Sequence, residues 1–258
     1  MTDGDVRYSR EGPVVTVTFD RPAARNAMTW RMYEQLGEAC ARIHGEAGVR
    51  VAVFRGAGGK AFIAGTDIAQ FQAFRSGDDG IAYEEKMEGY IGAVEKLPVP
   101  TLAVIEGFAI GGGLAIAAAC DLRIATPGSR FGVPIARTLG NCLSVANYAR
   151  LVAGLGAARA KRMLLLAENL SAEEALAGGF VSEIVEAAAL DGRVAELTSR
   201  LAQHAPLTMR VSKEAIRRLL HAGLPDGSDL VRTCYGSDDF RIGIKAFLEK
   251  REPQWTGK

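Results

Sequence analysis

Three consecutive glycines, Gly111, Gly112 and Gly113, follow a short apolar strand and precede a run of small residues that predicts a helix. The first N–H groups of a helix have no acceptor within it, and glycine lets another molecule approach the backbone closely. The positive end of the helix dipole adds to the attraction for a negative atom. The Gly112 N–H is therefore a candidate donor to a developing oxyanion.

A second glycine turn, Ala64-Gly65-Thr66-Asp67, lies earlier in the chain and also follows an apolar segment. Asp67 is expected to begin a short helix as its N-cap. Two backbone N–H groups directed at one point form an oxyanion hole, so Thr66 and Gly112 together predict chemistry on a carbonyl that becomes an enolate. Either motif alone fits a plain turn or a glycine-rich packing surface better. Their joint occurrence favours the site.

Short, nearly all-apolar strands are expected at residues 14–19, 49–54, 102–105 and 122–125, with helices at 29–45, 82–97 and 112–120. This alternation predicts an α/β fold whose sheet is covered on both faces. Later segments favour helices at residues 145–152, 157–166, 171–177, 188–203, 206–220 and 239–250, with one strand at 181–185. We expect an α/β core over residues 1–195 and a helical C-terminal region over 196–258.

The composition excludes several classes of protein. The 258 residues are 48% hydrophobic and 24% charged, with a net charge of +1, so no bulk field attracts nucleic acid or an anionic membrane. The cysteines form no CxxC pair and the histidines show no metal-ligand spacing, so no metal is expected. Residues 1–10 lack an apolar signal core, which predicts a cytoplasmic protein.

Two glycine-rich segments resemble nucleotide-binding motifs. Residues 56–61 (GAGGKA) fit the dinucleotide pattern after a strand. We expect residues 62–65 to be irregular instead of opening a helix, which argues against that function. The later glycine run is followed by Gly113-Leu114 instead of Lys-Ser/Thr, which excludes a Walker A loop.

Several further segments carry a family resemblance. They are residues 21–28 (RPAARNAM), 120–125 (CDLRIA), 131–134 (FGVP) and the C-terminal pieces Asp239-Phe240, Lys245-Ala246-Phe247 and Arg251-Glu252-Pro253. With the two glycine motifs, they make the chain resemble the crotonase (enoyl-CoA hydratase/isomerase) superfamily over nearly its whole length. The resemblance implies a spiral of β-β-α turns with a helical C-terminal trimerisation region, assembled as a homotrimer or a dimer of trimers. It implies an acyl-CoA thioester as the substrate and a place in fatty acid metabolism. Coenzyme A belongs to that substrate, so no separate cofactor is expected.

The resemblance also assigns residues. Thr66 and Gly112 would donate their N–H groups to the thioester oxygen. Arg25 matches the basic position near the CoA phosphates. The remaining CoA-binding positions, which line the adenine and pantetheine, are Ala27, Ala64, Gly65, Asp67 and Ile68. For the Asp67 side chain we favour the role of helix cap.

The chain departs from the family at the two positions that carry glutamates in hydratases. These positions hold Ala115 and Ile135, and neither side chain can take or give a proton. The two-glutamate hydratase mechanism is therefore disfavoured, and the single-glutamate isomerases lose support as well. Arg137 is a candidate to bind a substrate carboxylate, or else forms a surface or intersubunit ion pair. Asn141 is a candidate to orient water, or else caps a turn.

Other polar groups lie nearby in sequence. Cys142 is expected in the core instead of as a nucleophile, since nothing near it lowers its pKa. Tyr83, Glu84, Glu85 and Glu88 belong to an amphipathic segment that covers the acyl pocket in relatives. Most of this segment should face solvent, with one of its members reaching the site.

Three functions remain open. The first is an isomerase, hydratase or lyase that stabilises an acyl-CoA enolate. The second is a decarboxylase of malonyl-type acyl-CoA, because loss of carbon dioxide generates the enolate without a base. The third is a non-catalytic acyl-CoA-binding protein that has kept the oxyanion hole and lost the acids.

Overall fold

The main sheet has six strands in the order β1-β2-β3-β5-β7-β10. In the computed structural model, which describes residues 3–258, these strands are β1 (Asp5–Glu11), β2 (Val14–Asp20), β3 (Val51–Gly56), β5 (Thr101–Ile105), β7 (Leu122–Ala125) and β10 (Glu183–Ile184). β1 pairs with β2 in the antiparallel direction, and the other neighbours are parallel. The first two residues of the region predicted over 1–195 lie outside the described part.

A second, smaller sheet has the order β4-β6-β8-β9. Its strands are β4 (Ala61–Ala64), β6 (Phe108–Ile110), β8 (Arg130–Gly132) and β9 (Leu170–Ser171). Each turn of chain thus places one strand in the main sheet, the next in the second sheet, and then a helix: β3-β4-α2, β5-β6-α3 and β7-β8-α4. This arrangement confirms the α/β spiral of β-β-α turns.

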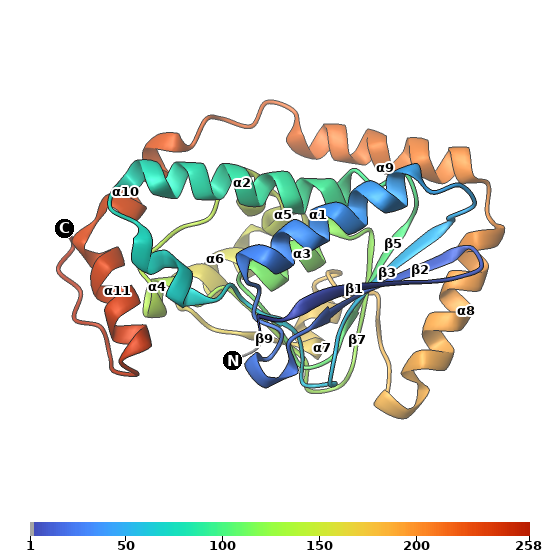
Figure 1. Ribbon diagram of the computed structural model, residues 1–258, viewed down its shortest axis with the longest axis horizontal. Helices are drawn as coiled ribbons and strands as arrows, with labels where there is room; N and C mark the ends of the chain where they lie inside the picture. Colours follow the sequence, from blue (N-terminus) through green and yellow to red (C-terminus); the bar gives the residue numbers. More distant parts are fainter. Residues whose placement is uncertain (1–2) are drawn as a thin grey trace.

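Helices flank these sheets (Figure 1). Those of the first half are α1 (Trp30–Gly45), α2 (Gly77–Glu95), α3 (Gly112–Ala119) and α4 (Ile135–Thr138). The later ones are α5 (Val145–Leu155), α6 (Ala157–Leu165), α7 (Ala172–Ala177), α8 (Leu190–Gln203), α9 (Pro206–His221), α10 (Ser228–Gly236) and α11 (Asp238–Leu248). Short 3₁₀ helices cover Pro22–Ala24, Ile68–Ala73 and Ala187–Ala189. The boundary predicted after residue 195 falls inside α8, and the division into two regions stays a prediction.

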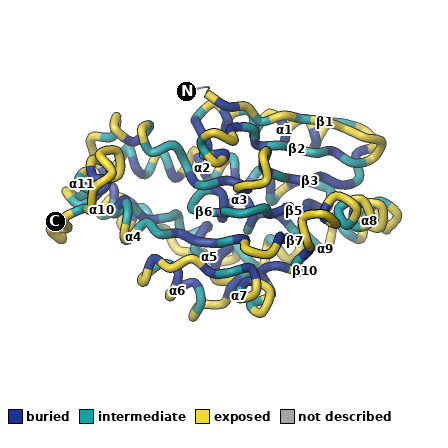
Figure 2. Tube along the Cα trace, turned by 90° about the horizontal axis from the view of Figure 1, so that it is seen from below, coloured by how far each residue is buried: buried dark blue, intermediate teal, exposed yellow. Residues whose placement is uncertain are grey.

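Burial follows the strands of the main sheet. Every residue of β5 is buried, whereas residues of β2 alternate between buried and half-buried, and β1 is mostly exposed at the edge. Figure 2 shows the same contrast between the dark central strands and the exposed outer helices. The apolar pattern predicted β2, β3, β5 and β7 because buried strands are rich in β-branched residues. The apolar pattern did not predict β1, because this edge strand is mostly polar and needs apolar residues only on the face that packs against the protein.

Two local predictions differ from the structure. Residues 61–64 form β4, so the irregular segment expected at 62–65 was wrong over most of its length. The strand pairs with β6 in the second sheet, and such tertiary pairing outweighs weak local propensity. Helix α2 begins at Gly77 and not at residue 82, because Ser76 and Asp79 form a capping box.

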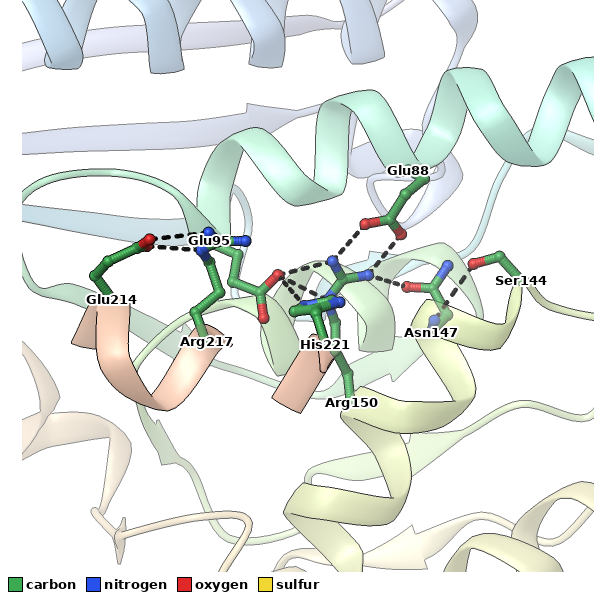
Figure 3. A network of polar contacts seen from close by, with 8 residues as sticks. All are labelled: Glu88, Glu95, Ser144, Asn147, Arg150, Glu214, Arg217 and His221. Atoms are coloured by element: carbon green, nitrogen blue, oxygen red, sulfur yellow. Dashed lines mark hydrogen bonds and ion pairs between the residues drawn. The ribbon is translucent and has the colours of Figure 1, made fainter. Parts of the chain in front are cut away.

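A polar network links the second half of α2 to α5 and α9 (Figure 3). The buried Arg150 of α5 pairs with Glu88 and Glu95 of α2, at 2.5 and 2.8 Å. His221 at the end of α9 contacts the same Glu95 at 2.9 Å. Arg150 Nη1 also donates to Asn147 Oδ1 at 2.9 Å. The network therefore fixes the start of α5 relative to α2, where the two helices approach the cavity described below.

Candidate functional site

A cavity of about 140 Å³ lies where the two glycine turns meet. Gly65 and Thr66 line it from the loop after β4, and Gly111 and Gly112 line it from the start of α3. The strands β4 and β6 are hydrogen-bonded neighbours in the second sheet, so their carboxyl ends lie together. This pairing brings into one site two turns that are distant in sequence.

The two predicted N–H donors lie next to each other. A Cβ atom at Gly112 would overlap Tyr33 Oη and lie 3.3 Å from Thr66 Oγ1. Tyr33 Oη is itself 2.8 Å from Thr66 Oγ1. Only glycine at position 112 therefore lets the start of α3 approach the Thr66 turn this closely.

The backbone hydrogen bonds around Thr66 join its two neighbours, Gly65 and Asp67, to Met28. Met28 N donates to Gly65 O and Asp67 N donates to Met28 O, each at 2.9 Å. In such a parallel bridge the N–H of Thr66 points away from Met28. Gly112 is the first residue of α3, and so its N–H has no acceptor within the helix. The structure thus brings both donors to one cavity, and their action on a substrate stays a prediction.

Ala115 and Ile135, at the positions where hydratases carry glutamates, line the same cavity. Ala115 is buried on α3 and Ile135 is half-buried at the start of α4. The wall beside the two donors is therefore apolar at both of these positions.

Backbone hydrogen bonds join the residues predicted to bind CoA. Ala64 N donates to Arg25 O at 3.0 Å, and Gly65 O accepts from Met28 N. Ala64, Gly65 and Ile68 line the cavity. The exposed Arg25 guanidinium lies 5.1 Å from the centre of the Phe108 ring. This guanidinium is accessible from solvent, as it must be to bind a phosphate group of CoA.

Asp67 holds this segment together. Its Oδ1 accepts from Ala69 N at 3.2 Å, which confirms the predicted N-cap of the helix over Ile68–Ala73. Its Oδ2 pairs with Arg21 Nη1 at 2.9 Å, and that nitrogen donates to Ala27 O at 3.1 Å. The Asp67 carboxylate thus has structural partners on both oxygens. CoA binding by Arg25, Ala27, Asp67 and their neighbours stays a prediction.

The two candidate replacements for the glutamates lie in different surroundings. Arg137 is exposed on α4 and is not among the described residues that line the cavity. Asn141 lines the cavity, and its Nδ2 donates to Tyr235 Oη at 3.1 Å. Within residues 3–258, the Asn141 Oδ1 atom is buried without a hydrogen-bond partner. An acceptor in this state is suited to a donor on a substrate or to a water molecule.

Glu84 of α2 is the carboxylate that lines the cavity. It is buried, with Oε1 accepting from Tyr235 Oη at 2.7 Å and Oε2 accepting from Ser144 N at 2.9 Å. Burial raises the pKa of Glu84 to about 7, although both hydrogen bonds act in the opposite direction. Its neighbour Tyr83 also lines the cavity, whereas Glu85 and Glu88 do not. One member of this segment was expected to reach the site; two of them, Tyr83 and Glu84, line the cavity, and their role in the site stays a prediction.

Sequence reasoning missed Tyr235, which comes from the C-terminal region. A Cβ atom at Gly80 would overlap the Tyr235 ring, so α10 packs closely against α2 at that point. Gly80 and Glu84 are one helical turn apart and therefore share a face. Gly80, one turn before Glu84, indicates that another element can pack closely against this face of α2. The sequence does not indicate that Tyr235 is the residue that packs there.

Cys142 is buried beside Cys234, as expected for a core residue. A hydrogen bond to Cys234 and burial both raise the pKa of the Cys142 thiol far above its usual range. The thiol is therefore protonated and a poor nucleophile.

The sequence model of enoyl-CoA hydratase/isomerase matches residues 9–258. The chain belongs to this family. It is 31% identical to the short-chain-enoyl-CoA hydratase of Clostridium acetobutylicum, over 98% of this chain and 97% of the relative. It is 34% identical to the (E)-benzylidenesuccinyl-CoA hydratase of Thauera aromatica, over 95% of this chain and 96% of the relative.

Solved structures agree with the family assignment. A structure of methylmalonyl-CoA decarboxylase in complex with 2-nitronate-propionyl-CoA superimposes with a TM-score of 0.90. The two sequences are 26% identical, and the match covers 98% of each chain. Across residues 3–258, the structure contains no helix that is both long and apolar enough to cross a membrane. The cytoplasmic location and the trimeric or hexameric assembly stay predictions.

Proposed function

We propose that this enzyme binds an acyl-CoA thioester and stabilises its enolate with the N–H groups of Thr66 and Gly112. The observation that carries the proposal is the meeting of the two glycine turns at one cavity. As the thioester becomes an enolate, negative charge collects on its oxygen, where donors fixed in place cost no reorganisation. One such donor contributes about 3 kcal/mol to the transition state.

The apolar side chains at positions 115 and 135 limit which reactions the cavity can catalyse. Addition of water by a pair of glutamates needs two proton-transferring groups, and Ala115 and Ile135 supply none. The cavity is still compatible with isomerisation, lysis or hydration in which another residue transfers the proton. These reactions share the step of enolate formation.

Decarboxylation of a malonyl-type acyl-CoA is the second candidate. The structural similarity to methylmalonyl-CoA decarboxylase supports it. When carbon dioxide leaves, the electron pair of the broken C–C bond stays behind and forms the enolate. No base is therefore required to form the enolate. Arg137, a candidate to bind a substrate carboxylate, lies exposed on α4 and is not among the described residues that line the cavity, so it would have to reorient to reach the departing carboxylate.

The test is mass spectrometry of acyl-, enoyl- and malonyl-type CoA thioesters incubated with the protein in deuterated water. Uptake of deuterium or water by a thioester supports enolate chemistry, and loss of carbon dioxide selects the decarboxylase. Binding of thioesters with no change of mass across the panel contradicts an enzymatic function and favours the acyl-CoA-binding protein. Light scattering on the same sample tests assembly as a homotrimer or a dimer of trimers.

A further inference from the structure

We infer that Glu84 is the acid/base residue of this cavity and takes the place of the glutamates absent at Ala115 and Ile135. The inference rests on the proposed function, since it assigns a proton-transferring group to the same enolate site. It differs from the family pattern in position, because Glu84 belongs to α2 and the two apolar residues belong to α3 and α4.

The first support is location. Glu84 lines the cavity together with Thr66 and Gly112, the two donors proposed for the thioester oxygen. A base must act on the carbon next to the thioester carbonyl, and so it must share a cavity with the oxyanion hole. Among the described residues that line this cavity, Glu84 carries the only carboxylate.

The second support is that the carboxylate is held in a defined orientation. Tyr235 Oη and Ser144 N bind one oxygen each, from α10 and from the residue that caps α5. Each carboxylate oxygen has about two lone-pair sites, so one hydrogen bond per oxygen leaves capacity for a substrate proton. The unpartnered Asn141 Oδ1 lies in the same cavity and can accept from a substrate hydroxyl or a water molecule.

The third support is the electrostatic environment. Burial has the largest effect and raises the pKa of Glu84. On the same helix the charge of Glu88 raises this pKa further, and Tyr83, whose own pKa is raised well above its usual value, also interacts with Glu84. The groups that face Glu84 from other elements are Tyr33 on α1, Tyr235 on α10, Cys142 before α5 and Tyr148 on α5. Burial raises the pKa of Tyr33 and of Tyr148 to about 12 and raises that of Tyr235 well above its usual value. These neighbours are therefore neutral where Glu84 titrates.

The chemical step balances with these groups alone. Glu84 as a carboxylate takes a proton from the α-carbon of the thioester, so a C–H bond breaks and an O–H bond forms on Glu84. The electron pair of the C–H bond forms the carbon–carbon double bond of the enolate, and the π pair of the carbonyl moves to the thioester oxygen, to which the N–H groups of Thr66 and Gly112 donate. In the reverse direction, protonated Glu84 returns the proton to the α- or γ-carbon. In a decarboxylation no C–H bond breaks: the electron pair of the broken C–C bond forms the enolate, and Glu84 in its protonated form gives its proton to the α-carbon and is reprotonated from solvent.

The experiment measures exchange of the α-hydrogens of butanoyl-CoA in deuterated water, and turnover of any thioester of the panel that the wild type converts. The variants are Glu84→Gln, which keeps the shape and an acceptor, and Glu84→Asp, which keeps the acid. Glu85→Gln is the matched control, because Glu85 is exposed on the same helix. Binding of butanoyl-CoA and the thermal unfolding of each variant are recorded alongside.

We expect Glu84→Gln to bind butanoyl-CoA normally and to lose at least about 100-fold in rate, with partial recovery in Glu84→Asp. Glu85→Gln should match the wild type. In the wild type, the rate should change with pH near neutrality as Glu84 ionises. Any residual activity of Glu84→Gln should lack this pH dependence. A folded Glu84→Gln protein with the wild-type rate and profile would overturn the assignment and leave the proposed function intact. A wild type that converts none of the thioesters would overturn both.

A second variant distinguishes direct proton transfer from a structural role. Tyr235→Phe removes a hydrogen bond that favours the ionised form of Glu84, so the pKa of Glu84 should rise. The pH–rate limb should move to higher pH, with the plateau rate largely retained. A lowered plateau with an unmoved limb would contradict the inference.

Discussion

Tyr235 donates its hydroxyl hydrogen to Glu84 Oε1 at 2.7 Å, across 151 residues of sequence. The contact joins the helical C-terminal region to the wall of a cavity whose proposed oxyanion donors, Thr66 and Gly112, belong to the α/β core. It exists because Gly80 admits the Tyr235 ring one turn before Glu84 on α2. The surroundings of the cavity carboxylate are therefore completed by both predicted regions of the chain.

The stability of the protein should depend on the protonation of Glu84. Its pKa is about 7 in the folded protein against 4.5 for an exposed glutamate, so between these values the folded state keeps a proton that the unfolded state has lost. The contribution to the free energy of unfolding is complete below pH 4.5 and is lost as the pH rises through about 7. It amounts to about 3 kcal/mol.

Glu84→Gln removes this contribution, and other titrating groups cancel in the comparison. Urea unfolding from about pH 5 to about pH 8 should show the variant gaining stability relative to the wild type as pH rises. A difference that stays constant over this range would mean that Glu84 ionises normally.

Removing the N–H at position 112 should abolish most of the activity. Gly112→Pro deletes the donor but also adds a Cβ atom against Tyr33 Oη and Thr66 Oγ1. We therefore place it in a Tyr33→Phe background, which removes the hydroxyl, and compare it with Gly112→Ala in the same background. Alanine keeps the N–H and has the same Cβ atom.

The proline protein should lose about 100- to 1000-fold in turnover relative to the alanine protein, with circular dichroism confirming that both are folded. Equal rates in the two proteins would show that Gly112 is not an oxyanion donor.

Restoring the two absent glutamates should raise hydratase activity. Ala115→Glu with Ile135→Glu places carboxyl groups at two positions that line the cavity beside Thr66 and Gly112. Hydration of crotonyl-CoA, followed by loss of the enoyl absorbance, should exceed that of the wild type. The control is Ala115→Gln with Ile135→Gln, which has the same size and no acid. A folded glutamate protein no faster than its glutamine control would show that cavity geometry also prevents hydration.

Loss of Arg150 should destabilise the protein strongly. Its side chain is 1% exposed, and truncation leaves Glu88 and Glu95 without their shared cation. Removing one partner of a buried ion pair typically costs about 3–5 kcal/mol. We expect Arg150→Met to lower the free energy of unfolding by that amount in urea. Arg218→Met is the control, since Arg218 is 75% exposed and its pairing with Glu214 is worth less than about 1 kcal/mol.

Much of the architecture was accessible from local pattern. The buried strands β2, β3, β5 and β7 were predicted because their residues are apolar throughout or in alternation. The helix expected from residue 29 has its first helical residue at Trp30, and Thr29 is its N-cap, with Oγ1 accepting from Met32 N. The helix expected from residue 171 begins at a capping box of Ser171 and Glu174, and such a cap depends only on neighbours within one turn.

The strands of the second sheet were not accessible in the same way. β4, β6, β8 and β9 are four residues long or shorter, and their pairing partners lie far along the chain. A short apolar stretch beside glycine is compatible with a turn, a strand or a helix start. Only the hydrogen bonds between distant segments decide among these.

The sequence by itself determined the family, the spiral fold, the two glycine turns and the absence of acids at Ala115 and Ile135, because motifs and residue identities are local. Tertiary structure decided which polar groups share the cavity. It buried Glu84 under Tyr235 and left Asn141 Oδ1 without a partner, while Arg137 stayed exposed. Burial and hydrogen bonding depend on contacts between segments that are remote in sequence, and these contacts set the pKa of Glu84 and its access to a substrate.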